Sequence, residues 1–196
     1  MALLKDVTLT DSIEIKTTPE KIFDFFTNIV GDESYRAWHP EDHVALRWIE
    51  GQPWKEGSVV YAEEYIHGKL HKLKFVVTKI IPNETIEYVP ASRFLRMYFP
   101  KNTFTMKQKG DTCVFTASGT YRVGWLIRTF AKNKLERSLS SVRKHMKEEG
   151  ENLKRILEAV ESSERAYDNG HLEEAAEYME KIRHTAAEFL EELERH

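Results

Sequence analysis

The chain has 196 residues, of which 41% are hydrophobic and 31% charged, a composition typical of one folded domain with room for an appendage. Its one cysteine, Cys113, excludes an intramolecular disulfide and a cysteine-rich zinc module. No apolar run approaches the ~18 residues of a membrane span, and the N-terminal segment soon turns polar, so we expect a cytoplasmic protein without signal peptide or integral membrane segment.

The net charge of -3 is unevenly distributed. Residues 151–196 contain 13 acidic and 6 basic residues, whereas the stretch from Arg122 to Lys147 contains eight bases and one acid. Neither balance indicates a nucleic-acid partner. We expect the basic stretch to be the solvated face of a helix, the alternative being contact with a phosphate or a membrane surface.

The first elements in chain order are a strand and a short helix. Residues 12–16 alternate in polarity as a strand does, and Thr18 followed by Pro19 predicts a helix start. The hydrophobic period then changes to two, which predicts antiparallel strands joined by short turns. These strands are Val44–Ile49, Ser58–Ile66, Lys69–Ile81, Thr85–Val89, Arg93–Phe99, Asn102–Lys109 and Cys113–Arg122.

A helical period begins near Leu126 and holds to about Tyr167, and Asn169 with Gly170 then breaks it before a last helix from Leu172. The long helix is the only element large enough to cover the apolar face of the sheet. The order predicts an α+β, helix-grip fold: a curved antiparallel sheet of six to seven strands around a long C-terminal helix. We assign residues 1–160 to this ligand-binding or catalytic domain and residues 161–196 to a C-terminal helical extension.

The hairpin around His67 and Gly68 allows a prediction of register. A two-residue turn places Glu64 opposite His71, on an otherwise apolar face that should line the interior, and leaves Glu63 and Lys72 in solvent. An unpaired interior carboxylate is costly, so Glu64 should bind His71 or a metal ion. A three-residue turn would shift the register and reverse this assignment.

The long helix carries a second carboxylate on its apolar seam. The seam passes through Glu149, one turn after His145, so both side chains share a helix face and could ligate one ion, although such a pair is often only a surface contact. Gly150, inside the helix, predicts a close packing contact or a bend. The apolar seam comprises Leu135, Leu139, Val142, Met146, Leu153, Ile156 and Val160.

A third set of polar residues directly precedes the predicted strand that begins at Val44. His39 and His43 lie within a short loop that also contains Glu41 and Asp42. Such a loop makes its imidazoles available for chemistry, although it could equally be a hydrophilic turn in which a histidine caps a strand.

The segment from Ile13 to Phe23, together with Gly57 to Val60 and the long helix, resembles the START-like (SRPBCC) superfamily, which includes polyketide cyclases, plant pollen-allergen relatives and lipid-transfer domains. The resemblance covers residues 8 to about 160. It implies a helix-grip fold with an internal cavity for a small apolar or aromatic ligand.

The polar residues resemble, more specifically, the metal site of the 2,4-diacetylphloroglucinol hydrolase group, which hydrolyses a carbon-carbon bond beside an aryl ketone. This resemblance implies a divalent metal, with zinc favoured and iron or manganese as competitors. It also implies that Tyr35 could bind a phenolic substrate, and His71 is a candidate acid-base group. The implied metal ligands are His43, Glu64, His145 and Glu149, with His39 as an alternative to His43.

The leading hypothesis is therefore a metal-dependent hydrolase acting on a small aromatic or polyketide-like ketone. The alternative is a non-catalytic carrier of a lipid or another apolar molecule. The last helix has its own apolar seam, which predicts an antiparallel hairpin with the preceding helix, at Leu153, Ile156, Leu157 and Val160, or else a homodimer. This second seam comprises Leu172, Ala175, Met179, Ile182, Ala186, Phe189 and Leu193.

Overall fold

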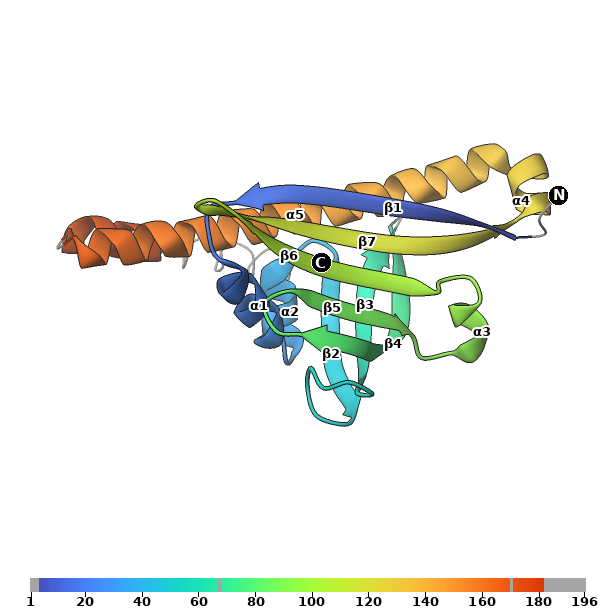
Figure 1. Ribbon diagram of the computed structural model, residues 1–196, viewed down its shortest axis with the longest axis horizontal. Coiled ribbons are helices and arrows are strands. Elements are labelled where there is room, and N and C mark those ends of the chain that lie inside the picture. The colour runs from blue at the N-terminus through green and yellow to red at the C-terminus, as the bar shows by residue number, and fades with distance from the viewer. Residues whose placement is uncertain (1–3, 67, 170, 182–196) are drawn as a thin grey trace.

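The computed structural model describes residues 4–66, 68–169 and 171–181 (Figure 1). Seven antiparallel strands form one sheet in the order β1-β7-β6-β5-β4-β3-β2, and a 37-residue helix, α5, crosses it. The expected α+β, helix-grip architecture is confirmed. The elements are β1 (Leu4–Ile15), α1 (Pro19–Thr27), α2 (Asp32–Trp38), β2 (His43–Glu50), β3 (Val59–Ile66), β4 (Lys69–Ile81), β5 (Thr85–Pro90), α3 (Arg93–Arg96), β6 (Lys101–Lys109), β7 (Thr112–Gly124), α4 (Trp125–Phe130) and α5 (Lys132–Asp168).

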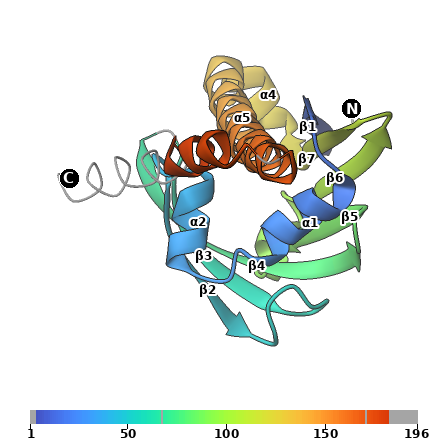
Figure 2. The same ribbon diagram turned by 90° about the vertical axis from the view of Figure 1, so that its left-hand side faces the viewer.

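The sheet curls around α5, as the end-on view shows (Figure 2). Helices α1 and α2 lie together at one end of the curl, whereas α3 and α4 lie at the other end (Figure 1). Within the described residues, no helix combines the length and apolar character that crossing a bilayer requires.

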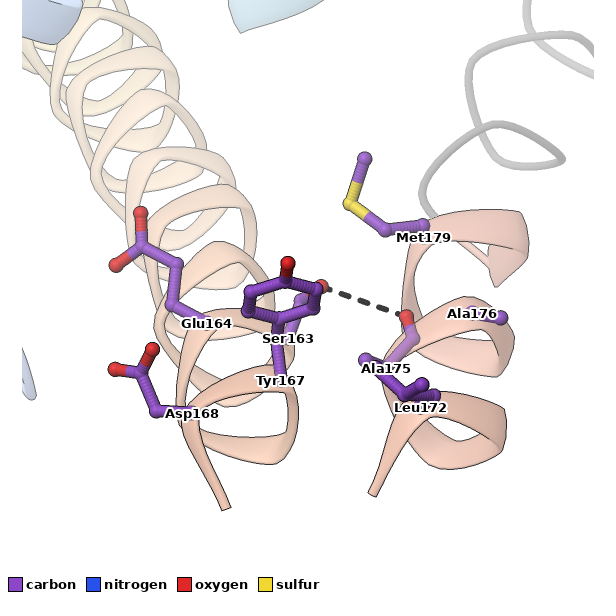
Figure 3. Close-up of a pocket in the computed structure, with 8 residues that line it drawn as sticks. All are labelled: Ser163, Glu164, Tyr167, Asp168, Leu172, Ala175, Ala176 and Met179. Carbon is purple, nitrogen blue, oxygen red and sulfur yellow. Dashed lines mark hydrogen bonds between the residues drawn. The ribbon is translucent and has the colours of Figure 1, made fainter. Parts of the chain in front are cut away.

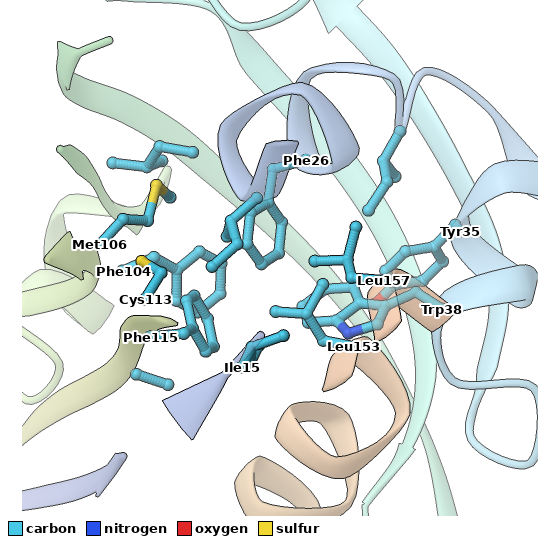
Figure 4. Packing of buried hydrophobic residues seen from close by; sticks show 14 of the residues in the cluster. Ile15, Phe26, Tyr35, Trp38, Phe104, Met106, Cys113, Phe115, Leu153 and Leu157 are labelled. Carbon is cyan, nitrogen blue, oxygen red and sulfur yellow. The ribbon is translucent and has the colours of Figure 1, made fainter. Parts of the chain in front are cut away.

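The hydrophobic core is concentrated at the end closed by α1 (Figure 4). The Phe26 ring of α1 stacks on Phe104 and Phe115 of the sheet, with ring centroids 4.9 and 5.4 Å apart. Leu153 and Leu157 of α5 complete this cluster, and no residue of α5 before Gly150 is fully buried. The C-terminal half of α5 is therefore packed as core, while its N-terminal half is less covered.

Two of the predicted elements are wrong. Residues 93–99 do not form a strand, because Ser92 Oγ accepts a hydrogen bond from the Leu95 N–H (3.4 Å) and caps the short helix α3. The predicted single helix from Leu126 is also divided, since Ala131 leaves helical geometry (φ -127°) and separates α4 from α5.

Helix α2 is an element that the hydrophobic periodicity did not reveal. Ser34 Oγ accepts hydrogen bonds from the Val30 and Gly31 N–H groups at the start of this helix. Asp32 Oδ1 accepts a hydrogen bond from the Leu46 N–H at 2.8 Å and ties α2 to β2. The sequence signal is the acidic first turn followed by Tyr35 and Trp38, which share one helix face.

The predicted hairpin register is confirmed. Glu64 pairs with His71, and Gly68 in the turn has a positive φ of 66°, a conformation that glycine adopts at little cost. The Glu63 carboxylate lies on the outer face, 3.4 Å from Lys72 Nζ. Glu64 therefore belongs to the inner face of the sheet, as the two-residue turn requires.

The chain reverses after α5, and residues 172–181 form a helix beside the end of α5 (Figure 3). Ser163 Oγ donates a hydrogen bond to the Ala175 carbonyl (3.4 Å), and an open groove of about 590 Å³ lies between the helices. The contact surface differs from the predicted one, because Leu153 and Leu157 belong to the main core. The remaining seam residues, Ile182, Ala186, Phe189 and Leu193, lie outside the described residues.

Substituting Gly150 by Ala should stabilise the protein. A Cβ at Gly150 would lie 3.5 Å from Ile13 Cγ2 and 3.7 Å from Asp11 Oδ2, which are ordinary contacts. Because alanine is the better helix former, the free energy of unfolding should rise by up to about 1 kcal/mol in urea denaturation.

Gly119→Ala is the matched control, since its Cβ would lie 3.0 Å from the Tyr121 hydroxyl and 3.2 Å from Asn102 Oδ1. This variant should lose stability. A loss in Gly150→Ala as large as that in Gly119→Ala would contradict the ordinary contacts described between Gly150 and the β1 residues Ile13 and Asp11.

Candidate metal centre

Four polar side chains, two from the sheet and two from α5, meet at the inner side of the middle of α5. His43 Nε2 lies 3.2 Å from Glu149 Oε1 and 3.9 Å from Glu64 Oε2. His145 Nε2 lies 3.6 Å from the same Glu149 oxygen. The structure therefore brings together the four residues that the sequence resemblance singled out, and one ligand atom each from His43, Glu64 and His145 lies within 4.8 Å of the others.

The Nδ1 atoms of His43 and His145 both form hydrogen bonds on the side of the ring away from the glutamates. His43 Nδ1 lies 3.0 Å from the Tyr35 carbonyl, which can only accept, so Nδ1 carries the proton. His145 Nδ1 lies 2.9 Å from Asp42 Oδ2 and is a donor by the same reasoning. In the neutral rings, both Nε2 lone pairs then point toward the carboxylates. A histidine that ligates a metal through one nitrogen typically donates its other N–H to a carbonyl or carboxylate in this way.

The electrostatics of the centre favour a cation. Burial disfavours the imidazolium of His145, but the nearby carboxylates of Glu149, Glu64 and Asp42 outweigh burial and raise its pKa. Burial likewise opposes ionisation of Glu149, yet His145 and His43 lower its pKa. The Nε2 lone pairs of the two neutral imidazoles face the two negative carboxylates. These groups repel one another unless a proton or a metal ion lies between them.

The His39 ring lies beside both of these histidines, with centroids 5.3 Å from His43 and 5.0 Å from His145. Its Nδ1 is buried, has no hydrogen-bond partner among the described residues and lies 3.8 Å from Asp42 Oδ2. Burial, with His43 and His145 nearby, lowers the pKa of His39. His39, Asp42 and His145 could also surround an ion, and this group includes neither glutamate. His43 is the histidine of this loop whose Nε2 lies near both glutamates.

The Tyr35 side chain contacts the centre directly. Its hydroxyl donates a hydrogen bond to Glu64 Oε2 at 2.7 Å, and its ring stacks on His43 with centroids 3.8 Å apart. Burial and the Glu64 carboxylate raise the pKa of Tyr35 well above its usual value, so the phenol stays a donor. The expected role of Tyr35 in binding a phenolic substrate stays a prediction.

Three more aromatic residues belong to the centre, of which Trp38 and Tyr88 were not anticipated. The Trp38 indole N–H donates to the Glu149 carbonyl (3.1 Å) and links α2 to α5. Burial, together with Glu149 and Glu64, raises the pKa of Tyr121 to about 12 and that of Tyr88 well above its usual value. Alternation along β5 and β7 was the available signal for these inward phenols. His71 is half-buried and lies directly across the strand pair from Glu64.

The sequence matches the family described as polyketide cyclase / dehydrase and lipid transport over residues 6–158. The chain therefore belongs to this family, whose description supports a ligand-binding or cyclase-type role. No curated protein matches the chain.

Solved structures share the fold at low sequence identity. Protein Ms6760 from Mycobacterium smegmatis is 16% identical, with a TM-score of 0.56 over 78% of this chain and 92% of its own. Major latex-like protein 151 from Panax ginseng is 17% identical, with a TM-score of 0.52 over 74% and 99%. The di-domain ARO/CYC protein BexL from the BE-7585A biosynthetic pathway is 15% identical, with a TM-score of 0.54 over 76% and 50%.

Removing the Tyr35 hydroxyl should destabilise the protein. Tyr35→Phe leaves the Glu64 carboxylate without its buried donor, so the free energy of unfolding, measured in urea with a chelator present, should fall by about 1 to 3 kcal/mol.

Tyr61→Phe provides the control, because the Tyr61 hydroxyl donates to Glu63 on the outer face of the sheet, where a lost hydrogen bond costs about 1 kcal/mol or less. Equal losses in the two variants would argue against a buried Tyr35–Glu64 interaction.

Proposed function

We propose that this protein is a divalent-metal-dependent hydrolase that acts on a small aromatic or polyketide-like ketone. One observation carries the proposal: two imidazoles, each anchored through Nδ1, direct their Nε2 atoms toward the carboxylates of Glu64 and Glu149. Family membership supports a small-molecule ligand. The resemblance to the 2,4-diacetylphloroglucinol hydrolase group supports the reaction type.

The donor set fits zinc. Two neutral imidazoles and two carboxylates match the nitrogen and oxygen preference of zinc and balance its charge, with iron or manganese as competitors. A bound zinc ion would polarise a ketone oxygen or lower the pKa of a bound water to about 7. The side chains of Glu64, His145 and Glu149 are 11 to 13% exposed, so none of the three is completely sealed from solvent.

The chain's own side chains would orient the ligands and the substrate. Tyr35 holds both Glu64 and His43, while Asp42 fixes the ring of His145. The inward phenols of Tyr88 and Tyr121 stay protonated near neutral pH and can donate hydrogen bonds to a polar ketone. His71, across from Glu64 on the inner face, is the proposed acid-base group.

A carrier of an apolar molecule is the second candidate function. The family description includes lipid transport, and the N-terminal half of α5 bears the half-buried apolar side chains of Leu135, Leu139 and Val142. In this case His43, His145 and the glutamates would form only a buried hydrogen-bonded network. A carrier should purify with an apolar molecule and without stoichiometric metal.

Metal content distinguishes the two functions. The protein should bind one zinc ion per chain, measured by elemental analysis after dialysis and by titration calorimetry, and His145→Ala should abolish stoichiometric binding because it removes a ligand.

His171→Ala is the matched control, since His171 is 65% exposed and lies beyond α5; it should retain full occupancy. Full metal occupancy in a His145→Ala, Glu149→Ala double variant would refute this metal centre.

His71 gives a test of the catalytic part of the proposal. His71→Ala should keep metal stoichiometry but lower kcat for hydrolysis of an acylated polyphenol by about 100-fold or more, the usual contribution of a positioned acid-base group. Release of the carboxylic acid measures the rate. A fully loaded wild-type protein that releases no acid from acylated polyphenols would exclude this substrate class, and unchanged kcat in the variant would exclude His71 as the acid-base group.

A further inference from the structure

A patch of exposed apolar side chains lies at the end of the molecule opposite α1. It consists of α3 with the residues that follow it and of α4, both at the same end of the sheet (Figure 1). Phe94, Met97, Leu126 and Phe130 are 63, 50, 56 and 78% exposed. Single exposed apolar residues are ordinary, but a concentration of them marks a surface for interaction.

The two parts of the patch are linked through β7. The Arg122 N–H of β7 donates to the Tyr98 carbonyl at 2.7 Å, and the rings of Phe99 and Tyr121 lie 5.6 Å apart. The segment after α3 therefore runs beside the end of β7, which leads directly into α4. Both parts of the patch are therefore joined to the same end of β7.

Basic residues border the patch. Residues 93–101 include three bases and no acid, and residues 122–137 include five bases with Glu136 as the only acid. Some of these bases are paired, as Lys101 is with Glu87 and Arg122 with Asp6. Arg93 and Lys134 have no ion-pair partner within the described part of the chain. The border therefore carries a positive charge.

We propose that this patch binds the surface of an anionic lipid bilayer. Aromatic and aliphatic side chains on short helices, with Lys and Arg beside them, are the combination that inserts at the boundary between headgroups and acyl chains. A second copy of the chain suits the patch poorly, because a symmetric contact would bring two basic borders together. The positive charge of the border therefore favours an anionic bilayer over a second copy of the chain.

The patch lies beside the start of α5, which is the less covered half of that helix. Helix α5 begins beside the patch and reaches His145 after roughly 20 Å, and the side chains of Leu135, Leu139 and Val142 along this stretch are half-buried. A bilayer bound at the patch would lie at the less tightly packed end of the sheet. This proposal does not depend on whether the centre holds a metal.

Co-flotation with vesicles tests the proposal. The full chain should float with vesicles of phosphatidylcholine and phosphatidylserine in equal amounts, and much less with phosphatidylcholine alone. A Leu126→Ser, Phe130→Ser double variant should partition at least tenfold more weakly because it removes inserted apolar surface. An Arg93→Gln, Lys134→Gln variant should lose at least tenfold on anionic vesicles, and high salt should reproduce this loss.

The matched control is Leu172→Ser, Met179→Ser, since these side chains are 62 and 57% exposed at the far end of α5; partitioning should not change. Equal weakening in the control, or no binding to anionic vesicles by the wild type, would overturn the proposal. So would a lipid-free dimer, detected by sedimentation, that Leu126→Ser, Phe130→Ser converts to a monomer, because the patch would then be an interface between copies.

Discussion

The structure depends on how two carboxylates are accommodated in its interior. Glu64 comes from the inner face of the sheet and Glu149 from the inner face of α5, and each is only 13% exposed. Charges in such a position need partners. Tyr35 donates to Glu64, while His43 and His145 face Glu149. These partners hold α2, the start of β2 and α5 in one arrangement.

The position of the polar centre follows from the uneven packing along α5. Beyond Gly150, Leu153 and Leu157 are buried against the sheet and α1, so this half of the helix is held firmly. Before His145 the helix is only partly covered. His145 and Glu149 lie at the boundary between the closely packed half and the less covered half of the helix. A site on rigid elements, beside an accessible region, suits the binding of a small molecule.

Helix α4, the middle of α5 and the last turns of α5 have different roles. The helix α4 presents apolar side chains to the outside, the middle of α5 carries the polar centre, and its last turns bind Thr17 and Lys21 at the closed end through Glu161. The proposed bilayer surface includes α4 and the proposed metal centre includes the middle of α5, so the two lie on separate helices. Binding at the first surface need not disturb the geometry of the second.

The sequence by itself determined the class of fold, because alternation with period two and the long helical period are local properties of the chain. It also determined the hairpin register, since the short turn at Gly68 places Glu64 opposite His71. Local pattern failed at residues 93–99, where the apolar alternation of a strand was outweighed by the cap at Ser92.

The tertiary structure alone decided which imidazole meets the carboxylates. The sequence does not distinguish His39 from His43 as the histidine that faces the glutamates. In the structure, Tyr35 of α2 stacks on the His43 ring, and His43 Nε2 lies near Glu149. The partners Tyr35 and Glu64 are 29 residues apart, and Trp38 and Glu149 are 111 apart. No local period encodes such contacts, because they arise only when the sheet curls and brings α2 against α5.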